Sequence, residues 1–356
     1  FYYDFNTRYL TFAGIILFFL ITNHLIKKNL INLNLIFSSY IIFFFLIYID
    51  TIYQTIFLKD LFGYKYLHGY QRFAGPFGDE YILGGFMSFF IFPTIVLSYF
   101  SKRNNPIIKF LYLIFVLISI YIALKTGERI AFFTILLQCF LFFLFFKFNI
   151  KNLLVMFFAI VVILSTIFFD KGVQQKYNHF FKLLFNYQKI ISVDKSNQKE
   201  EIKKTINKIS FFNTQSGAHF LTAYEIWKNY KIFGIGIKNF RNESSKEIYS
   251  SIKSHQVKYR VATHPHNYQL EILSETGLFG FILFNILLLI LIYNFIWLNR
   301  RNMNISIYLK VFIIVVISKY FPFKTDSSIF SSSLGLLFWI FLIYAICSYN
   351  KMIKTK

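Results

Sequence analysis

The chain has 356 residues, of which 56% are hydrophobic, and it carries a formal net charge of +22. Its mean hydropathy of +0.53 and its apolar runs of about twenty residues exclude an ordinary soluble domain. Lys, Asn, Ile and Phe are abundant together, as an AT-rich genome would produce, so the charge does not predict a nucleic-acid partner. Cys139 and Cys347 both lie in apolar runs, which excludes a disulfide framework.

Nine apolar runs predict membrane-spanning helices, each close to the length that a bilayer core requires. We therefore expect an all-α polytopic membrane protein. The runs cover residues 9–26, 30–49, 81–100, 107–124, 130–147, 152–169, 277–298, 305–321 and 328–348.

Basic residues in the short connections predict the orientation. Pairs such as Lys27-Lys28, Lys102-Arg103 and Arg300-Arg301 all fall on one side of the membrane if the nine spans are real. The positive-inside rule makes that side cytoplasmic. The N-terminus, which opens with Phe1, then falls outside, and we expect an odd number of further helices upstream.

This topology predicts three regions. Residues 1–169 form an N-terminal region of six spans, residues 170–276 form a large outer loop, and residues 277–356 form a C-terminal region of three spans. Within the loop, apolar residues from Tyr224 to Ile232 predict an amphipathic helix that could lie against the membrane, broken by Gly234 and Gly236.

Polar groups on the outer side are candidates for chemistry. Arg72 precedes Gly75-Pro76, Lys125 and Arg129 lie between two spans, and Arg241 follows the Gly234-Ile235-Gly236 turn. Arginines at a membrane surface bind phosphates well because the planar guanidinium donates several hydrogen bonds and stays charged. For Arg72 and Arg129, simple anchoring at the interface is the alternative.

The segment Thr263-His264-Pro265-His266-Asn267 ends the outer loop, directly before an apolar run. We expect Thr263 to cap the following helix and Pro265 to occupy its first turn. His266 then lies near the positive end of the helix dipole, which favours a neutral imidazole that can accept a proton from a hydroxyl. The alternative is a polar interface histidine.

Two further points concern this segment and the helix that follows it. A metal site on His264 and His266 has too few ligands, so no metal is predicted. Glu271 and Glu275 are interpreted simply as acids at the start of a helix.

The histidine motif, His266-Asn267 and then, after nine intervening residues, Gly277-Leu278-Phe279-Gly280, resembles the signature of the O-antigen ligase and O-antigen polymerase family. Other segments agree in the family's order, from about residue 60 to the C-terminus. They are Arg72-Phe73-Ala74-Gly75-Pro76-Phe77, Thr126-Gly127-Glu128-Arg129 and Phe233-Gly234-Ile235-Gly236-Ile237-Lys238-Asn239-Phe240.

The resemblance implies a glycosyltransferase of the bacterial inner membrane with a fold similar to the GT-C class, about twelve helices in the whole protein, and an active site facing the periplasm. The donor would be a glycan on undecaprenyl diphosphate. The acceptor would be a lipid A core sugar in a ligase, or another lipid-linked glycan in a polymerase. No metal or other cofactor is implied.

Carried over by position, His266 and Arg129 match the family's catalytic residues, and Arg72 matches a second arginine. We group His264, Asn267 and Lys125 with the substrate-binding residues. The sequence departs from the family at Ser216-Gly217-Ala218-His219, where many members have an arginine. Either His219 substitutes for it or Arg241 binds the phosphate.

Three functions remain open. A ligase is favoured over a polymerase because the outer segment 50–80 is modest in size. A transporter of lipid-linked glycans is a third possibility, but mid-membrane acids or broken helices in paired halves, which would indicate one, are not visible.

Overall fold

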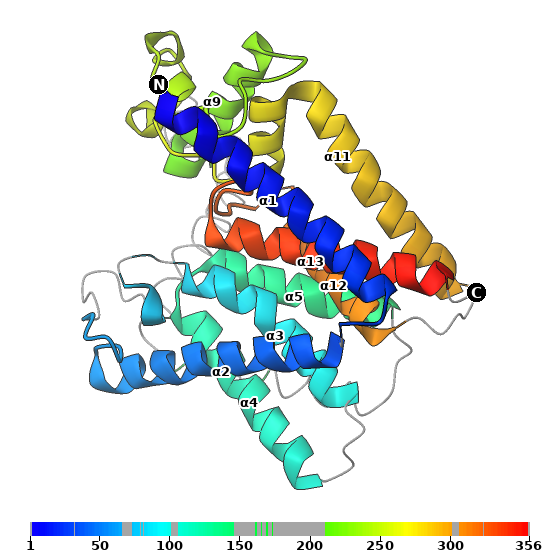
Figure 1. The fold of residues 1–356 in the computed structure, drawn as a ribbon. Coiled ribbons are helices and arrows are strands. Elements are labelled where there is room, and N and C mark those ends of the chain that lie inside the picture. The colour runs from blue at the N-terminus through cyan, green and yellow to red at the C-terminus, as the bar shows by residue number, and fades with distance from the viewer. Residues whose placement is uncertain are drawn as a thin grey trace, which may run out of the picture. The chain divides into compact units, whose positions relative to one another are not determined.

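The structure is a computed structural model. It describes residues 2–31, 33–65, 73–78, 80, 82–100, 106–145, 211–300, 306–322 and 324–354, and the single positions 161, 165, 169 and 173. In these residues the regular elements are helices, apart from one isolated bridge between Lys59 and Lys65 (Figure 1). The all-α prediction is therefore confirmed for the described residues.

Helices form at every predicted span that the structure describes, because long apolar runs favour a fully hydrogen-bonded backbone. The predicted span 152–169 lies almost wholly outside the described residues, and so does Arg72. The helices are α1 (Tyr2–Lys27), α2 (Leu33–Phe57), α3 (Leu83–Phe100), α4 (Pro106–Lys125), α5 (Arg129–Phe145), α11 (Tyr268–Arg300), α12 (Ile307–Lys319) and α13 (Ser333–Lys354).

Two helices, Tyr268–Arg300 and Ser333–Lys351, are long and apolar enough to cross a membrane by length and composition. The complete set of nine spans stays a prediction. Shorter apolar helices cover Ala13–Lys27, Ile42–Phe57, Leu83–Thr94 and Arg129–Phe145.

The described part of the outer loop has short helices of its own around a small core. They are α9 (Gln215–Asn229), α10 (Phe240–Ser244), and the 3₁₀ turns η2 (Phe211–Asn213), η3 (Glu247–Tyr249) and η4 (Val257–Tyr259). Ala223, Ile226, Phe240 and Tyr249 are buried together. The predicted amphipathic helix ends earlier than expected, since the backbone leaves the helical region at Tyr230 rather than at Gly234.

The chain divides into two compact units. The first comprises residues 1–21, 179–301 and 320–340, and the second comprises residues 22–178, 302–319 and 341–356. The three regions predicted from the topology stay a prediction.

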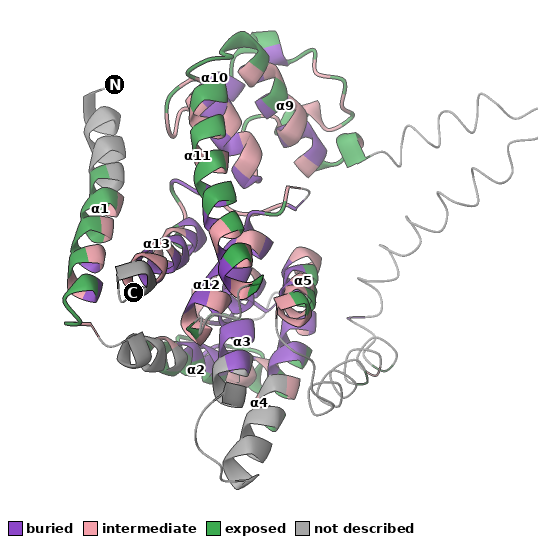
Figure 2. Ribbon diagram, turned by 90° about the vertical axis from the view of Figure 1, so that its right-hand side faces the viewer, coloured by how far each residue is buried: buried purple, intermediate pink, exposed green. Residues whose placement is uncertain are grey.

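In the second unit, α3 is the central helix, and its buried residues form much of the core (Figure 2). A lysine at the end of α12, Lys319, is only 1% exposed. Its Nζ donates to the Gly85 carbonyl at 3.0 Å and lies 3.9 Å from the centroid of the Phe89 ring. Gln138 of α5 extends this polar contact, donating to the Ser88 carbonyl at 2.9 Å and to Ser318 Oγ at 3.0 Å.

In the first unit, the segment 231–236 lies along the beginning of α11. The amides of Leu278 and Phe279 donate to the carbonyls of Lys231 and Ile232 at 2.8 and 3.1 Å. In return, the amides of Ile235 and Gly236 donate to the carbonyls of Ser274 and Glu275. Four backbone hydrogen bonds therefore join the 231–236 segment to residues 274–279 of α11.

Two glycines permit this close approach. Gly277 has a φ of +66°, and a Cβ on it would lie 2.2 Å from the Ile232 carbonyl oxygen. Gly234 has a φ of +67°, and a Cβ on it would lie 2.5 Å from the backbone of Glu275 and of Gly277. Both the left-handed conformation and the backbone contact exclude a larger residue. Gly277 also bends α11, since its dihedral angles are not helical.

We predict that Gly277→Ala destabilises the protein by about 2 kcal/mol or more, because it adds strain at a positive φ to a backbone clash. Gly14→Ala is the matched control, since Gly14 lies in α1 with nothing within 4 Å of an added Cβ. Thermal unfolding in detergent should show a lower melting temperature for Gly277→Ala alone. Equal melting temperatures for the two variants would contradict the close contact.

Candidate functional site

Three histidines of the first unit lie together. His219 is in the second turn of α9, whereas His264 and His266 precede α11. The ring centroids of His219 and His266 are 4.8 Å apart with the planes at 24°, and those of His264 and His266 are 4.1 Å apart. The structure thus brings His219 together with two histidines that follow it by more than forty positions in the sequence.

Asn267, and not Thr263, caps the helix that follows. α11 begins at Tyr268, and the Asn267 Oδ1 accepts from the Leu270 amide at 2.9 Å. The prediction for Thr263 and Pro265 was therefore wrong: both lie before the helix, and Thr263 Oγ1 instead lies 2.8 Å from His264 Nδ1. An amide at this position can satisfy an N-terminal donor as well as a hydroxyl can.

The other end of the Asn267 amide holds a distant segment. Its Nδ2 donates to the carbonyls of Pro322 and Lys324 at 2.7 and 2.9 Å. The Asp326 amide donates to the His266 carbonyl at 2.8 Å. Asn267 is 2% exposed and its amide is occupied by the protein, so its geometry favours a positioning role over the substrate contact predicted from the sequence.

His266 has a φ of +56°. A residue other than glycine is uncommon in this left-handed region, although histidine is among the more tolerant residues. Such a conformation persists only where surrounding contacts fix it, here the bond from Asp326 and the cap at Asn267. The imidazole is thereby placed against His219 rather than along the helix.

The pKa values of these imidazoles are low. Burial, and then the neighbouring His219, lower the pKa of His266 to about 4, whereas the Asp326 backbone and carboxylate raise it less. Burial, then His266 and His219, lower the pKa of His264 to about 3. Burial also lowers the pKa of His219, opposed by a hydrogen bond with the Tyr259 backbone. The neutral His266 expected from the sequence is therefore supported, but burial is the main cause rather than the helix dipole.

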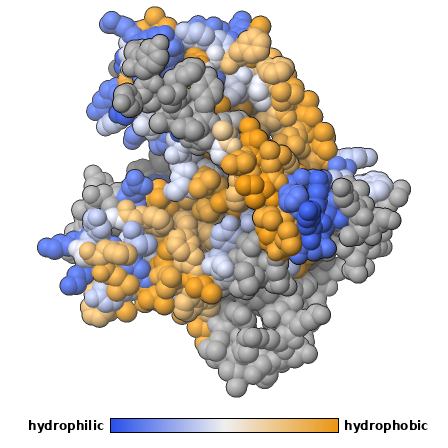
Figure 3. Space-filling model, viewed as in Figure 1, coloured by the Kyte–Doolittle hydropathy of each residue, from blue (hydrophilic) through white to orange (hydrophobic). Residues whose placement is uncertain are grey.

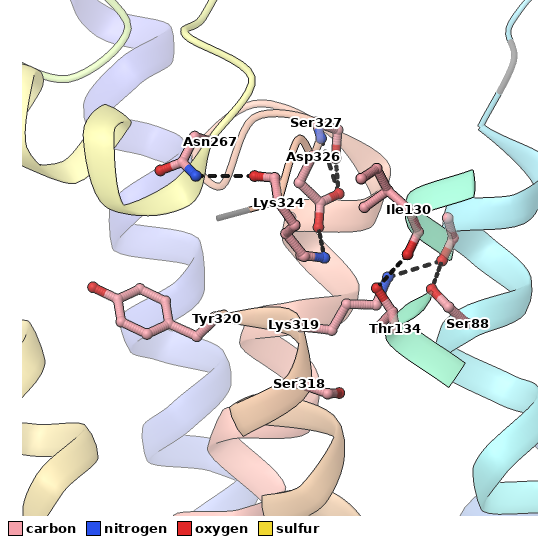
Figure 4. Close-up of polar contacts among 12 residues, drawn as sticks. Ser88, Ile130, Thr134, Asn267, Ser318, Lys319, Tyr320, Lys324, Asp326 and Ser327 are labelled. Carbon is pink, nitrogen blue, oxygen red and sulfur yellow. Dashed lines mark hydrogen bonds and ion pairs between the residues drawn. The ribbon is translucent and has the colours of Figure 1, made fainter. Parts of the chain in front are cut away.

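Asp326 and Lys324 belong to this site, and the sequence analysis missed them. Lys324 Nζ contacts the Asp326 carboxylate, whose Oδ1 also accepts from the Ser327 amide at 2.9 Å (Figure 4). The two side chains are almost buried. Their position between two predicted spans on the outer side was the available signal, because ionisable residues there are usually functional or paired.

Glu271 and Glu275 are more than acids at the start of a helix. Both are 1% exposed. Glu271 accepts from Ser328 Oγ and from the Ile329 amide at 2.9 Å. Glu275 accepts from the amides of Lys238 and Phe240 at 2.7 and 3.3 Å. The simple interpretation was therefore incomplete, since each carboxylate fastens a separate loop to α11.

The start of α9 is built to place His219. Thr214 caps the helix, its Oγ1 accepting from the Gly217 amide at 3.1 Å. Gly217 packs against the backbone of η2, where a Cβ would lie 2.1 Å from the Phe211 carbonyl oxygen. His219, two residues later, is 2% exposed, and within the described residues its Nδ1 has no hydrogen-bond partner.

Two arginines of the first unit differ in their surroundings. Arg241 is exposed on α10. Arg260 is half-buried and directly follows Tyr259, whose backbone contacts His219. The Arg260 Nε is buried without a hydrogen-bond partner in the described part of the chain. The sequence analysis did not select Arg260, because nothing in its spacing marks it.

The second unit holds the other predicted site residues. Arg129 begins α5, and Lys125 Nζ lies 5.9 Å from the ring centroids of both Phe73 and Tyr121. Glu128 lies between Lys125 and Arg129 in the sequence, and its carboxylate accepts from the amides of Gly84 and Gly85 at 2.8 and 2.9 Å. This bidentate bond to the start of α3 fixes the turn that carries Arg129.

A metal site is not formed by the residues that the structure describes. They contain no group of three histidine, cysteine or acidic side chains able to hold an ion.

We predict that His219→Gln raises the pKa of His266 from about 4, because it removes a neighbouring ring whose positive charge opposes protonation. Side-chain NMR of histidine-labelled protein would measure the titration. His255→Gln, at an exposed position of the same unit, should leave the pKa of His266 unchanged.

The pKa of His266 in the folded protein is below the ordinary 6.5, so the unfolded chain binds protons at a higher pH. The free energy of unfolding should therefore fall as the pH is lowered from 6.5 to 4. A His266 that titrates near 6.5 would contradict the burial.

A search of the curated proteins found no match. Residues 113–285 match the family model described as O-antigen ligase. The matched stretch contains Arg129 and the three histidines. The family is membrane-integral, and it implies an enzyme of the glycosyltransferase type that handles lipid-linked glycans. Just under half of the chain, residues 113–285, is thus similar to the O-antigen ligase family.

Proposed function

We propose that the protein is an O-antigen ligase-type glycosyltransferase. It transfers a glycan from undecaprenyl diphosphate to a lipid A core sugar at the periplasmic face of the bacterial inner membrane. The observation that carries the proposal is His266, an imidazole that lies against His219 and whose backbone is held by Asp326, in the stretch that matches the family. A base of this kind can act on a sugar hydroxyl at physiological pH.

The reaction is a direct displacement. His266 takes the proton of the acceptor hydroxyl while its oxygen bonds to the anomeric carbon of the donor. The bond between that carbon and the diphosphate oxygen breaks, and the electron pair leaves with undecaprenyl diphosphate. The anomeric carbon is inverted. The Asp326 carboxylate favours the imidazolium that forms, since it raises the pKa of His266.

Cationic side chains stabilise the charge that develops on the leaving diphosphate. Arg129 has this role, together with Arg72 or a loop arginine, and Lys125 contacts the donor. Arginine can supply in this way what a divalent cation supplies to other lipid-diphosphate enzymes, so the reaction is proposed to need no metal. His264 borders the acceptor side, because its ring lies against His266.

The ligase reaction is favoured over the polymerase reaction by the modest outer segment 50–80. A polymerase, which joins two lipid-linked glycans, is the second candidate. Both reactions use the same base and the same leaving group, so the arrangement around His266 supports either. A transporter of lipid-linked glycans stays the third and least favoured candidate.

We predict that the full-length gene restores laddered lipopolysaccharide in a strain that lacks its own ligase but makes lipid-linked O-antigen. His266→Ala should lower transfer by about 100-fold or more, since a general base contributes that much. His255→Ala should retain the ladder. Long chains produced only in a polymerase-deficient strain would instead identify a polymerase. Full activity of His266→Ala in either strain would refute the base assignment.

We predict that Arg260→Gln lowers transfer about 100-fold, whereas Arg241→Gln retains most of it. Arg260 is half-buried, adjoins the residue that contacts His219, and has an unsatisfied Nε, whereas Arg241 is exposed. Transfer assays on purified variants in proteoliposomes would measure the effect. The opposite ranking would assign the loop's phosphate contact to Arg241.

A further inference from the structure

An apolar surface of the first unit lies where the outer loop meets α11. Ile232 and Phe233 are 64% and 71% exposed, and Leu278 and Phe279 are 43% and 57% exposed. The rings of Phe233 and Phe279 lie 5.9 Å apart. These four residues, called here the loop foot, form one patch although they come from two segments of the chain.

The loop foot is held rigidly. Its two halves are joined by the bonds from the amides of Leu278 and Phe279 to the carbonyls of Lys231 and Ile232. The close backbone contact between Gly234 and Gly277 fixes the same part of the two segments. The exposed side chains are therefore presented by a fixed backbone, which distinguishes them from the side chains of a loop tip that happen to face water.

The patch continues into the surface of a membrane-length helix. In the most apolar part of α11, only 22% of the residues are buried within the protein. Its exposed apolar residues continue directly from Phe279, and Figure 3 shows an almost unbroken hydrophobic surface over this helix. They are Ile282, Leu283, Ile286, Leu287, Leu289 and Ile290.

The rim of the foot has the chemistry of a lipid interface. Tyr230 and Lys231 are exposed directly before the apolar pair. Aromatic residues with a polar tip and lysines whose stems lie along apolar surface are typical of the headgroup region. A protein partner would not require this continuity with the lipid-facing side of a span.

We propose that the loop foot is a membrane-interface anchor, with Ile232, Phe233 and Phe279 in the acyl region of the outer leaflet and Lys231 at the anionic headgroups. The anchor fixes the depth of the outer loop, because the 231–236 segment also carries the glycine turn that Glu275 holds. The inference does not depend on the proposed reaction.

Spin labels test the proposal in nanodiscs of phosphatidylethanolamine and phosphatidylglycerol. A label on Phe233→Cys or Ile232→Cys should collide often with oxygen and rarely with a water-soluble nickel chelate. A label on Glu247→Cys, exposed in the same unit, should show the reverse. Frequent collision with nickel at 233 would overturn the anchor. Rare collision with both reagents would also overturn it, by indicating a protein contact.

A second measurement needs no cysteine. Phe233→Trp adds a fourth indole to the three of the natural chain, and brominated lipid should quench the added emission. Glu247→Trp should add emission that brominated lipid leaves unquenched. Equal quenching for the two variants would overturn the proposal even if a cysteine variant failed to fold.

Discussion

Hydrogen bonds from one face of α11 to three separate backbone segments hold the first unit together. Asn267, Glu271 and Glu275 follow one another at intervals of four, which places them on the same face. Each takes a different partner: the 322–324 segment, the 328–329 segment and the 238–240 turn. Buried carboxylates are costly unless hydrogen bonds satisfy them, and backbone amides that would otherwise be unpaired do so here. The buried carboxylates and the backbone amides that they bind are thereby both hydrogen-bonded.

The histidine cluster depends on this arrangement. His266 keeps its left-handed conformation because its own carbonyl is bound by Asp326 and the next residue caps α11. A base that is fixed before the substrate arrives needs little reorganisation during proton transfer. His219 reaches the same place from α9, whose first turn contains a glycine, Gly217, packed against η2. Backbone contacts of glycine thus position the imidazoles as much as the side-chain bonds do.

Much of this was predictable, and the reason for the remainder is physical. Apolar runs of membrane length predicted the helices because the bilayer leaves the backbone few alternatives. The histidine motif also stood out, since it adjoins such a run. The Asn267 cap was missed because Thr263 and Pro265 formed an equally ordinary helix start four residues earlier. Asp326 was missed because its importance comes from a contact with His266, far away in the sequence, and Arg260 was missed because nothing in its spacing marks it. The interval of four between Asn267, Glu271 and Glu275 was visible in the sequence, but the segments that these side chains bind were not.

The lysine at the end of α12 has a consequence for biogenesis. Lys319 finds its carbonyl and its aromatic ring in α3, 234 residues earlier in the chain. In an isolated α12 the Lys319 ammonium would lack these partners at the end of an apolar helix, where burying a charge in lipid is unfavourable. α3 is synthesised first and already provides Gly85 and Phe89 when α12 leaves the ribosome. The insertion of α12 is therefore coupled to an assembled bundle, and the order of synthesis becomes part of how this membrane protein is made.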